Sequence, residues 1–336
     1  MKRDRVLLAH GGGGSLTREL IETMLLPRLE NPLLKPLDDS AVLVMGNSGY
    51  AFTSDSYVVT PYLFPGGDIG RLAVCGTVND LAVMGAQPFW LSLSLILEEG
   101  LPLTDLSTIV DSIHAAAAEV GAQVVTGDTK VVERGKCEGL YINTAGLGKI
   151  SVPYWLGSAN VKPGDAVIIN GPIGEHGVAV MSRREGVAFQ TSVTSDCAPL
   201  WPLVKAILDT GARIRAMRDP TRGGVAGAVC DIARASNVGI RLFEDAIPIS
   251  GEVRGACDLL GLDPLTIANE GKVLVFCGAK DAEPVLAAMK NHPLGRQARV
   301  IGEVSTKPEG MALLRTTIGG ERIIDMPTGE DLPRIC

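Results

Sequence analysis

The last residue of the chain is a cysteine, Cys336, whose thiol lies next to the terminal carboxylate. It ends the tail MPTGEDLPRIC (residues 326–336), which contains two prolines and one glycine and shows no apolar periodicity. Such a tail is predicted to be flexible and to leave its thiol exposed. With an unperturbed pKa of about 8.5, only a minority of such thiols is ionised at neutral pH. Ten extended residues could reach roughly 33–36 Å, so the thiol could enter a distant cleft and the rest of the chain should supply something for it to reach.

Aspartates recur in the first half of the chain at places where strands or turns are predicted to end. They are Asp38 and Asp39 in LDDSAV, Asp55 in TSDSY, Asp80 in VNDLAVMGAQP and Asp128 in TGDTK. A single Asp is also typical of a turn or a helix cap. As a set, the carboxylates could converge on divalent cations, because Mg²⁺ binds to a few carboxylates, water and substrate phosphates. The set therefore indicates a nucleotide–metal site.

A run of glycines follows His10 in the sequence HGGGG, ahead of a predicted helix. Backbone N–H groups in such a loop could bind a phosphate, although a flexible connection would have the same sequence. The sequence contains neither G-x-x-x-x-G-K-[ST] nor G-x-G-x-x-G, so it has neither a P-loop nor a Rossmann fingerprint. A nucleotide would therefore be bound by a different fold.

Three further side chains could act on a transferred group. Lys130, two residues after Asp128, could neutralise charge on a phosphoryl group. Arg222 in DPTRGG lies beside backbone donors, although this motif is also typical of an ordinary helix start. Glu270 in ANEGKV precedes a predicted strand and could act as a general base, although a solvated surface glutamate is the ordinary alternative.

The pattern of apolar residues predicts two α+β units of similar size to position these groups. A helix is predicted over 15–26 with Ser15 as its N-cap, and strands and helices follow up to residue 150. The periodicity fails after that point, so a domain boundary is predicted near 150–163. The second half repeats the alternation and closes with a hairpin over 311–325. The fold class is α+β with two α/β domains, and the predicted divisions are a glycine-rich segment and helix (1–34), a first domain (35–152), a second domain (153–325) and the tail (326–336).

The composition of the 336 residues, with 46% apolar and 21% charged residues, is that of a globular protein. The net charge of −7 without a basic block makes nucleic acid an unexpected partner. Neither a signal peptide nor a membrane-spanning stretch is predicted. Seven cysteines occur without a CxxC pair, which argues against a zinc site or disulfides and predicts a cytoplasmic location. The six cysteines other than Cys336 lie in apolar runs and are predicted to be buried.

Several of these motifs together resemble a known superfamily. DDSAV, TSDSYVVTP, VNDLAVMGAQP, TGDTKVV and DPTRGGV, in this order, resemble the PurM-like superfamily of aminoimidazole ribonucleotide synthetase and selenophosphate synthetase. HGGGGS near the start and PRIC at the end are similar to the HypE family of hydrogenase maturation factors. The resemblance implies a homodimer in which the first domains of two chains form a β-barrel, with ATP and Mg²⁺ bound in an aspartate-rich cleft.

The resemblance also implies a reaction. A partner carbamoyltransferase, HypF, would load a carbamoyl group onto the thiol of Cys336. Phosphorylation of the carboxamide oxygen by ATP, followed by loss of phosphate and the N–H protons, would leave a thiocyanate. The thiocyanate would then supply cyanide to iron on a HypC–HypD complex. The chain is accordingly predicted to be an ATP-dependent carbamoyl dehydratase that makes the cyanide ligands of [NiFe]-hydrogenase.

The resemblance assigns roles to residues of this sequence. Lys130 would hold the carboxamide or phosphoryl oxygen and Glu270 would act as base on the amide nitrogen. With Cys336 and His10 these form the predicted catalytic set. Contacts to ATP and Mg²⁺ are predicted for the carboxylates, and contacts to phosphates for the glycines: Asp38, Asp55, Asp80, Asp128, Gly11, Gly12, Gly13 and Gly14. The second choices are Asp39, Asn79 and Arg222.

Two alternatives remain open from the sequence. Another synthetase or kinase of the superfamily is one, but a selenophosphate synthetase should carry a reactive cysteine near the glycine loop, whereas the first cysteine here is Cys75. A non-catalytic maturation scaffold is the other, in which the tail thiol would dock a partner or share a metal. Hydrolysis of ATP, or its absence, separates an enzyme from a scaffold.

Overall fold

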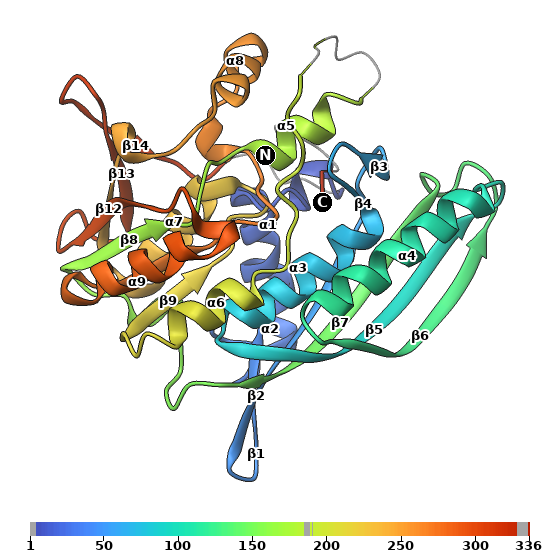
Figure 1. Cartoon of the computed structure of the whole chain (residues 1–336), viewed down its shortest axis with the longest axis horizontal. Coiled ribbons are helices and arrows are strands. Elements are labelled where there is room, and N and C mark those ends of the chain that lie inside the picture. The colour runs from blue at the N-terminus through green and yellow to red at the C-terminus, as the bar shows by residue number, and fades with distance from the viewer. Residues whose placement is uncertain (1–4, 185–188, 190, 328–334) are drawn as a thin grey trace.

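The computed structural model describes residues 5–184, 189, 191–327 and 335–336, and it contains two large sheets with helices packed against them (Figure 1). In the view of Figure 1 the N-terminal sheet lies on the right and the C-terminal sheet on the left, with α3 and α6 between them. The predicted α+β architecture is confirmed.

The first sheet has five strands in the order β1-β2-β7-β5-β6. Its neighbouring strands are antiparallel, except that β5 and β6 are parallel. Buried and half-buried residues alternate along β7, as expected when helices cover only one face of a sheet. The bounds are β1 (Ala41–Met45), β2 (Ser48–Tyr57), β5 (Ala86–Glu98), β6 (Gln123–Val132) and β7 (Leu140–Ile150), with a small hairpin of β3 (Leu63–Phe64) and β4 (Gly67–Asp68).

Helix α3 (Ile69–Val83) lies against the covered face of this sheet. Asp68 caps it by accepting hydrogen bonds from the N–H groups of Gly70 and Arg71. The sequence of α3 is mostly apolar, and almost every residue is buried because α4 (Leu103–Glu119) and α6 (Trp201–Leu208) cover the sides that the sheet leaves open. Polar residues near its C-terminal end therefore lie in the interior of the molecule.

The second sheet has seven strands in the order β14-β13-β10-β12-β8-β11-β9. Its central strands are apolar on both faces: Ile169 packs in the cluster with α7, whereas Ile168 packs in the cluster with α6 and α9. The bounds of its strands are β8 (Asp165–Ile169), β9 (Ile214–Arg218), β10 (Gly239–Phe243), β11 (Leu274–Gly278), β12 (Arg299–Ser305), β13 (Met311–Arg315) and β14 (Glu321–Ile324). The helices of this half are α5 (Glu175–Met181), α6, α7 (Gly224–Ser236), α8 (Gly251–Leu260) and α9 (Ala279–Asn291).

The N-terminal helix predicted over 15–26 is continuous but not uniform. It comprises α1 (Ser15–Leu20), a π-helical segment (Ile21–Leu25) and α2 (Leu26–Leu29). The prediction of Ser15 as N-cap is wrong by one residue: Gly14 is the N-cap, because Ser15 is already helical and donates its N–H to the carbonyl of Pro327 at 2.9 Å. The start of the tail thus lies against the start of this helix. Short 3₁₀ turns lie at Leu8–His10, Ser158–Asn160, Glu244–Ala246, Pro264–Thr266 and Pro293–Gly295.

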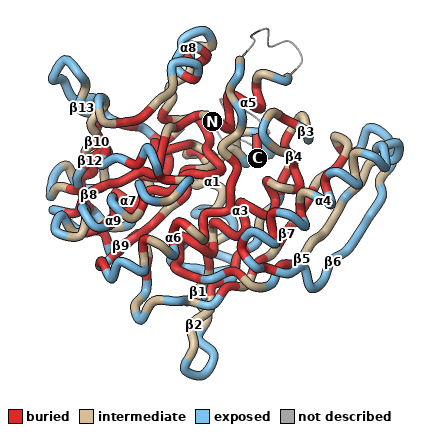
Figure 2. Tube along the Cα trace, in the orientation of Figure 1, coloured by how far each residue is buried: buried red, intermediate tan, exposed pale blue. Residues whose placement is uncertain are grey.

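The two halves share one hydrophobic core. A single cluster of buried side chains contains α3 residues such as Leu72 and residues of the second sheet such as Val275, with α6 between them. Figure 2 shows this buried region at the centre, and exposed chain at α8, at β6 and at the tip of the β1–β2 hairpin. β7 ends at Ile150 and β8 begins at Asp165, so their connection spans the predicted boundary, while the division into domains stays a prediction. Among the described residues, no helix is long and apolar enough to cross a membrane.

Candidate active site

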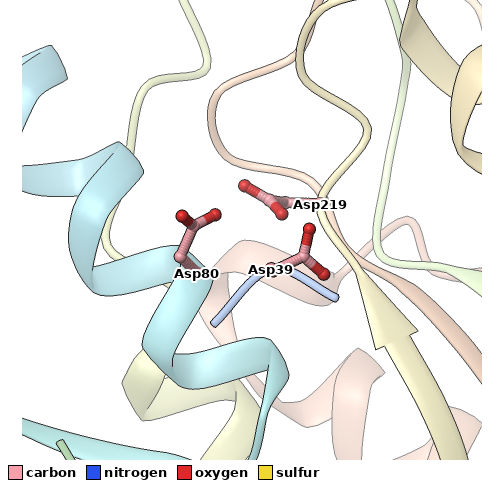
Figure 3. A group of neighbouring side chains, drawn as sticks. All are labelled: Asp39, Asp80 and Asp219. Atoms are coloured by element: carbon pink, nitrogen blue, oxygen red, sulfur yellow. The ribbon is translucent and has the colours of Figure 1, made fainter. Parts of the chain in front are cut away.

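Three aspartates converge between the two halves of the molecule. Asp39 comes from the segment before β1, Asp80 from α3 and Asp219 from the loop after β9, and Figure 3 shows their carboxylates turned toward one another. One oxygen of each lies within 4.8 Å of the others. We call these three residues the acidic cluster. The loop after β9 places Asp219 here because it leaves the sheet at the edge strand that faces α3.

Burial and mutual repulsion make ionisation of the acidic cluster unfavourable. Burial raises the pKa of Asp219 to about 7, and the nearby Asp39 carboxylate adds to the rise. Burial likewise raises the pKa of Asp39 to about 6 and that of Asp80 well above its ordinary value. A divalent cation would relieve the repulsion, and three carboxylate oxygens are the hard ligands that Mg²⁺ takes. The cluster therefore has the chemistry of a Mg²⁺ site.

An arginine keeps one member of the acidic cluster in place. Arg218, at the end of β9, lies with its Nε 3.2 Å from Oδ1 of Asp39 and its Nη2 3.8 Å from Oδ2 of Asp231. Asp231 on α7 also pairs with Arg18 on α1. Asp80 is held separately, since the hydroxyl of Thr53 donates to its Oδ2 at 2.7 Å. The N-terminal helix and the C-terminal half of the chain thus both help to orient the carboxylates.

The terminal thiol lies inside the molecule. Cys336 is only 6% exposed, so the prediction of an exposed thiol is wrong: the last two residues pack into the core shared by the two halves. Arg222 Nη1 lies 3.9 Å from its Sγ, and Arg222 Nη2 lies 3.9 Å from Oδ1 of Asp55. Burial raises the pKa of the Cys336 thiol to about 12, which outweighs the opposite effect of Arg222. In this position the sulfur is neutral and suits a neutral group bound to it.

Glu270 is a buried carboxyl group close to this thiol. It is 2% exposed, and its Oε1 has no hydrogen-bond partner among the described residues. Burial raises its pKa well above the ordinary value, Asp219 adds to the rise, and Arg222 opposes it. Its charge in turn raises the pKa of the Cys336 thiol. A carboxylate desolvated in this way is a strong base, and its free oxygen is the atom that could accept a proton.

The glycine loop lies beside the same residues. Gly13 has a φ of +72°, and a Cβ at this position would lie 2.7 Å from Cβ of Arg222. A Cβ on Gly14 would lie 2.2 Å from the carbonyl oxygen of Pro327. Only glycine allows the loop to approach both the DPTRGG turn and the start of the tail this closely.

Comparison with known proteins identifies the fold. The family model for the AIR synthase related protein, N-terminal domain, matches residues 37–150, and that for its C-terminal domain matches residues 162–313. The chain is 47% identical over 337 residues to the carbamoyl dehydratase HypE of Cupriavidus necator, and this match covers 100% of the chain and 96% of that protein. The chain belongs to the HypE family. The resemblance drawn from the motifs is confirmed.

Solved structures of HypE proteins have the same fold. A crystal structure of a HypE–HypF complex matches with a TM-score of 0.87 at 44% identity, covering 92% of this chain and 99% of the matched chain. A HypE in complex with ATP matches with a TM-score of 0.82 at 43% identity, covering 99% and 100%. The PurM-like α+β fold expected of a HypE family member is thereby confirmed.

The structure brings together only part of the site that the HypE resemblance implied. Cys336, Glu270 and Asn79 are buried, whereas Asp39, Asp55 and Asp80 are half-buried around them. Arg222 is 39% exposed and reaches from the surface to Cys336 and Asp55, and Gly13 and Gly14 lie beside its turn. Asn79 donates from its Nδ2 to the Glu270 carbonyl at 3.3 Å. Asp38 instead accepts a hydrogen bond from the backbone N–H of Ser158 at 3.1 Å, next to the acidic cluster but not in it.

Other predicted residues lie elsewhere in the single chain. Asp128 and Lys130 are both exposed on β6, the edge strand, and form an ion pair of 2.6 Å with each other. His10 lies in a 3₁₀ turn, where its Nδ1 accepts from the N–H of Leu7 at 2.8 Å. The roles assigned to these residues, and to Gly11 and Gly12, stay predictions.

Asp219 is the member of the acidic cluster that the sequence reasoning did not assign. It is the first residue of DPTRGG and directly follows β9. A carboxylate at the end of a strand, directly after the arginine that pairs with Asp39, was the available signal.

Proposed function

We propose that this chain dehydrates a carbamoyl group bound to the sulfur of its own Cys336, with ATP as the second substrate. That the chain is a carbamoyl dehydratase of hydrogenase maturation follows from its membership of the HypE family, whose curated relatives carry that name. The observation that carries the proposal to particular atoms is the burial of the Cys336 sulfur beside Arg222, within electrostatic reach of the buried Glu270 carboxyl group, whose Oε1 has no partner among the described residues.

The proposed reaction removes one oxygen and two protons from the thiocarbamate. The carboxamide oxygen attacks the γ-phosphorus of ATP, the bond from that phosphorus to the bridging oxygen breaks, and ADP leaves. The oxygen is then part of a phosphate, a good leaving group. Loss of both N–H protons and cleavage of the C–O bond release phosphate and leave a thiocyanate on sulfur. Together these atoms are those of one water, so the balance is ATP hydrolysed to ADP and phosphate for each thiocyanate formed.

Glu270 is proposed to take a proton from the amide nitrogen. Its desolvated carboxylate has a raised pKa, which makes it a better base than an ordinary glutamate. Arg222 contributes positive charge close to the sulfur and to Asp55. The acidic cluster would hold Mg²⁺, which supplies charge neutralisation to the phosphates of ATP when it is bound. A relative in this family has been crystallised in complex with ATP, which supports this arrangement.

A homodimer would give Lys130 and Asp128 a role. Every residue of β6 from Gln123 to Val131 is exposed in the single chain, including Val125 at 54% and Val131 at 67%. β6 pairs with β5 on one side only, and an edge strand with exposed apolar side chains is commonly covered in native proteins. We infer that the first sheets of two chains pair as a β-barrel, with Lys130 of one chain placed at the cleft of the other.

Partners follow from the chemistry of the thiol. A relative forms a complex with HypF, which supports HypF as the carbamoyl donor for Cys336. A HypC–HypD complex as cyanide acceptor and a cytoplasmic location remain predictions. Because the docked thiol has a pKa near 12, we expect loading to occur with the tail outside the cleft, where the thiolate forms more readily.

Intact mass tests the proposal directly. The full-length chain, a Cys336→Ala variant and a matched Cys137→Ala control would be incubated with HypF and its substrates, and then with ATP and Mg²⁺. We expect the wild type and the control to gain a carbamoyl group and then to lose the mass of one water only with hydrolysable ATP, while Cys336→Ala stays unmodified. ATP hydrolysis without any modification of Cys336 would contradict the proposal and indicate another activity of the superfamily.

A further inference from the structure

A buried histidine that the proposed chemistry does not use touches the backbone of the tail. His176 lies in α5, is 0% exposed, and its Nε2 is 2.5 Å from the carbonyl oxygen of Ile335. Its Nδ1 is 2.8 Å from the hydroxyl of Ser195. The ring of Phe64 packs edge-on against the imidazole at 5.4 Å between centroids, which fixes the plane of the ring.

The directions of these hydrogen bonds are determined by chemistry. A carbonyl oxygen only accepts, so Nε2 of His176 must carry the proton that is donated to Ile335. The imidazole is neutral because burial lowers its pKa, so Nδ1 has no proton and accepts from the hydroxyl of Ser195. The Ser195 oxygen in turn accepts from the N–H of Cys197 at 3.1 Å. Every donor in this series of hydrogen bonds meets an acceptor, so Ser195 selects the tautomer of His176 that donates to the Ile335 carbonyl.

We propose that His176, oriented by Ser195, is the latch that docks the C-terminal backbone and sets the position of the Cys336 sulfur. This rests on the proposed function for its purpose, but not for its geometry. The held carbonyl group belongs to the peptide bond that joins Ile335 to Cys336. Once that peptide plane is fixed, the sulfur moves only by rotation about φ and χ1 of Cys336. One hydrogen bond can therefore confine the reacting atom to a small volume.

The same segment of chain that orients the latch also positions Glu270. Asp196, next to Ser195, accepts from the N–H groups of Glu270 at 3.1 Å and Gly271 at 3.2 Å. Its carboxylate is itself fixed by Nζ of Lys272 at 2.9 Å.

Ala198, at the end of this segment, donates its N–H to the Glu270 carbonyl at 3.3 Å. Residues 195–198 thus tie the tail carbonyl and the proposed base to one rigid piece of backbone, which sets the distance between base and sulfur. His176 is accordingly a positioning residue and not a catalytic one.

The test measures access to the Cys336 thiol, with iodoacetamide as the probe and alkylation read by mass on the C-terminal peptide of the full-length chain. His176→Phe fills the same space without a donor, and we expect it to raise the alkylation rate about tenfold. His176→Gln retains a donor and should stay within about twofold of wild type. Ser195→Ala should give an intermediate increase of about threefold. Ser182→Ala, which removes a hydrogen bond at the other end of α5, is the matched control and should change nothing.

A second readout separates a latch from a general loss of structure. If His176 positions the loaded sulfur, His176→Phe should slow single-turnover dehydration while leaving the rate of loading by HypF unchanged or faster, since loading uses the undocked tail. His176→Gln should restore dehydration.

Equal alkylation rates in wild type, His176→Phe and Ser195→Ala would overturn the latch, as would a Gln variant as accessible as the Phe variant. Should His176→Phe fail to fold, Ser195→Ala gives the same decision. Failure of the wild type to dehydrate a loaded tail would refute the proposed function instead, and the order of alkylation rates would still decide the latch.

Discussion

Replacing Glu270 with glutamine separates its chemical role from its structural one. The carboxyl group is 2% exposed, its Oε1 lacks a hydrogen-bond partner among the described residues, and burial raises its pKa well above the ordinary value. Glutamine has the size and neutrality of the protonated side chain. We therefore expect the free energy of unfolding of Glu270→Gln at pH 7 to stay within about 1 kcal/mol of wild type.

The effect on rate should be much larger. A positioned general base contributes about 10²- to 10⁴-fold, so Glu270→Gln should slow single-turnover dehydration of the carbamoyl-loaded chain by that factor, or about 3–5 kcal/mol in the barrier. The wild-type rate should rise with pH as Glu270 ionises, and the variant should lose this dependence. Glu303→Gln is the matched control, because Glu303 is an exposed glutamate on β12 whose pairing with Arg241 is remote from the cleft.

The assay follows loss of the mass of one water from the loaded chain after rapid mixing with ATP and Mg²⁺, with urea unfolding of both variants in parallel. A Glu270→Gln variant that dehydrates within about fivefold of the control would refute the assignment of Glu270 as the base. A slow variant that is also destabilised by several kcal/mol would refute the claim that the carboxyl group acts chemically.

Three further predictions concern charge, close packing and subunit sharing. Folding raises the pKa of Asp219 from 3.8 to about 7, which corresponds to about 4 kcal/mol of stability that is fully present below about pH 4 and is lost as the pH rises through 7. Without divalent cations, the free energy of unfolding of Asp219→Asn in urea should therefore match that of wild type at pH 4 and exceed it at pH 8. A variant that tracks wild type over the whole range would contradict this. Gly13→Ala should lower the free energy of unfolding by about 2 kcal/mol, because φ is +72° and the new Cβ would lie 2.7 Å from Cβ of Arg222; an unchanged thermal midpoint would argue against the packing. If Lys130 of one chain serves the cleft of the other, mixing inactive Lys130→Ala and Glu270→Gln chains should recover about one quarter of wild-type activity, because half of the dimers are mixed and each mixed dimer has one intact site. No recovery would place both residues in the cleft of one chain or exclude Lys130 from the site.

Much of the fold could be predicted from the sequence because the apolar periodicity and the turn residues of each element lie within the element itself or next to it. The alternation of strands and helices predicted up to residue 150 is present, with α3 (Ile69–Val83) and α4 packed on the first sheet. The closing hairpin over 311–325 is present as β13 and β14. The N-cap was misplaced by one residue because Gly14 is fixed by contact with Pro327, more than 300 residues away in the sequence, and no local pattern carries that information.

The site could be predicted less completely, because its members meet only in three dimensions. Asp80, Glu270 and Arg222 were expected to take part, since each follows or precedes a predicted element end. The order of residues along the chain cannot say that Asp128 lies on an exposed edge strand while Asp219 joins Asp39 and Asp80. The burial of Cys336 could not be predicted from the sequence either, because a short segment rich in turn residues predicts mobility unless its binding site is known.

The core that the two halves share has a consequence for the catalytic cycle. Because α3 and α6 join both sheets through one continuous cluster of buried side chains, the halves should unfold in a single cooperative transition and should not swing apart as hinged lobes. An enzyme of this build cannot admit or release a bulky protein-bound substrate by opening its cleft. Exchange must then proceed by withdrawal and return of the chain terminus alone. The turnover rate would then depend on how fast the terminus leaves the cleft, and tighter binding of the terminus would slow the transfer of its group between partner proteins.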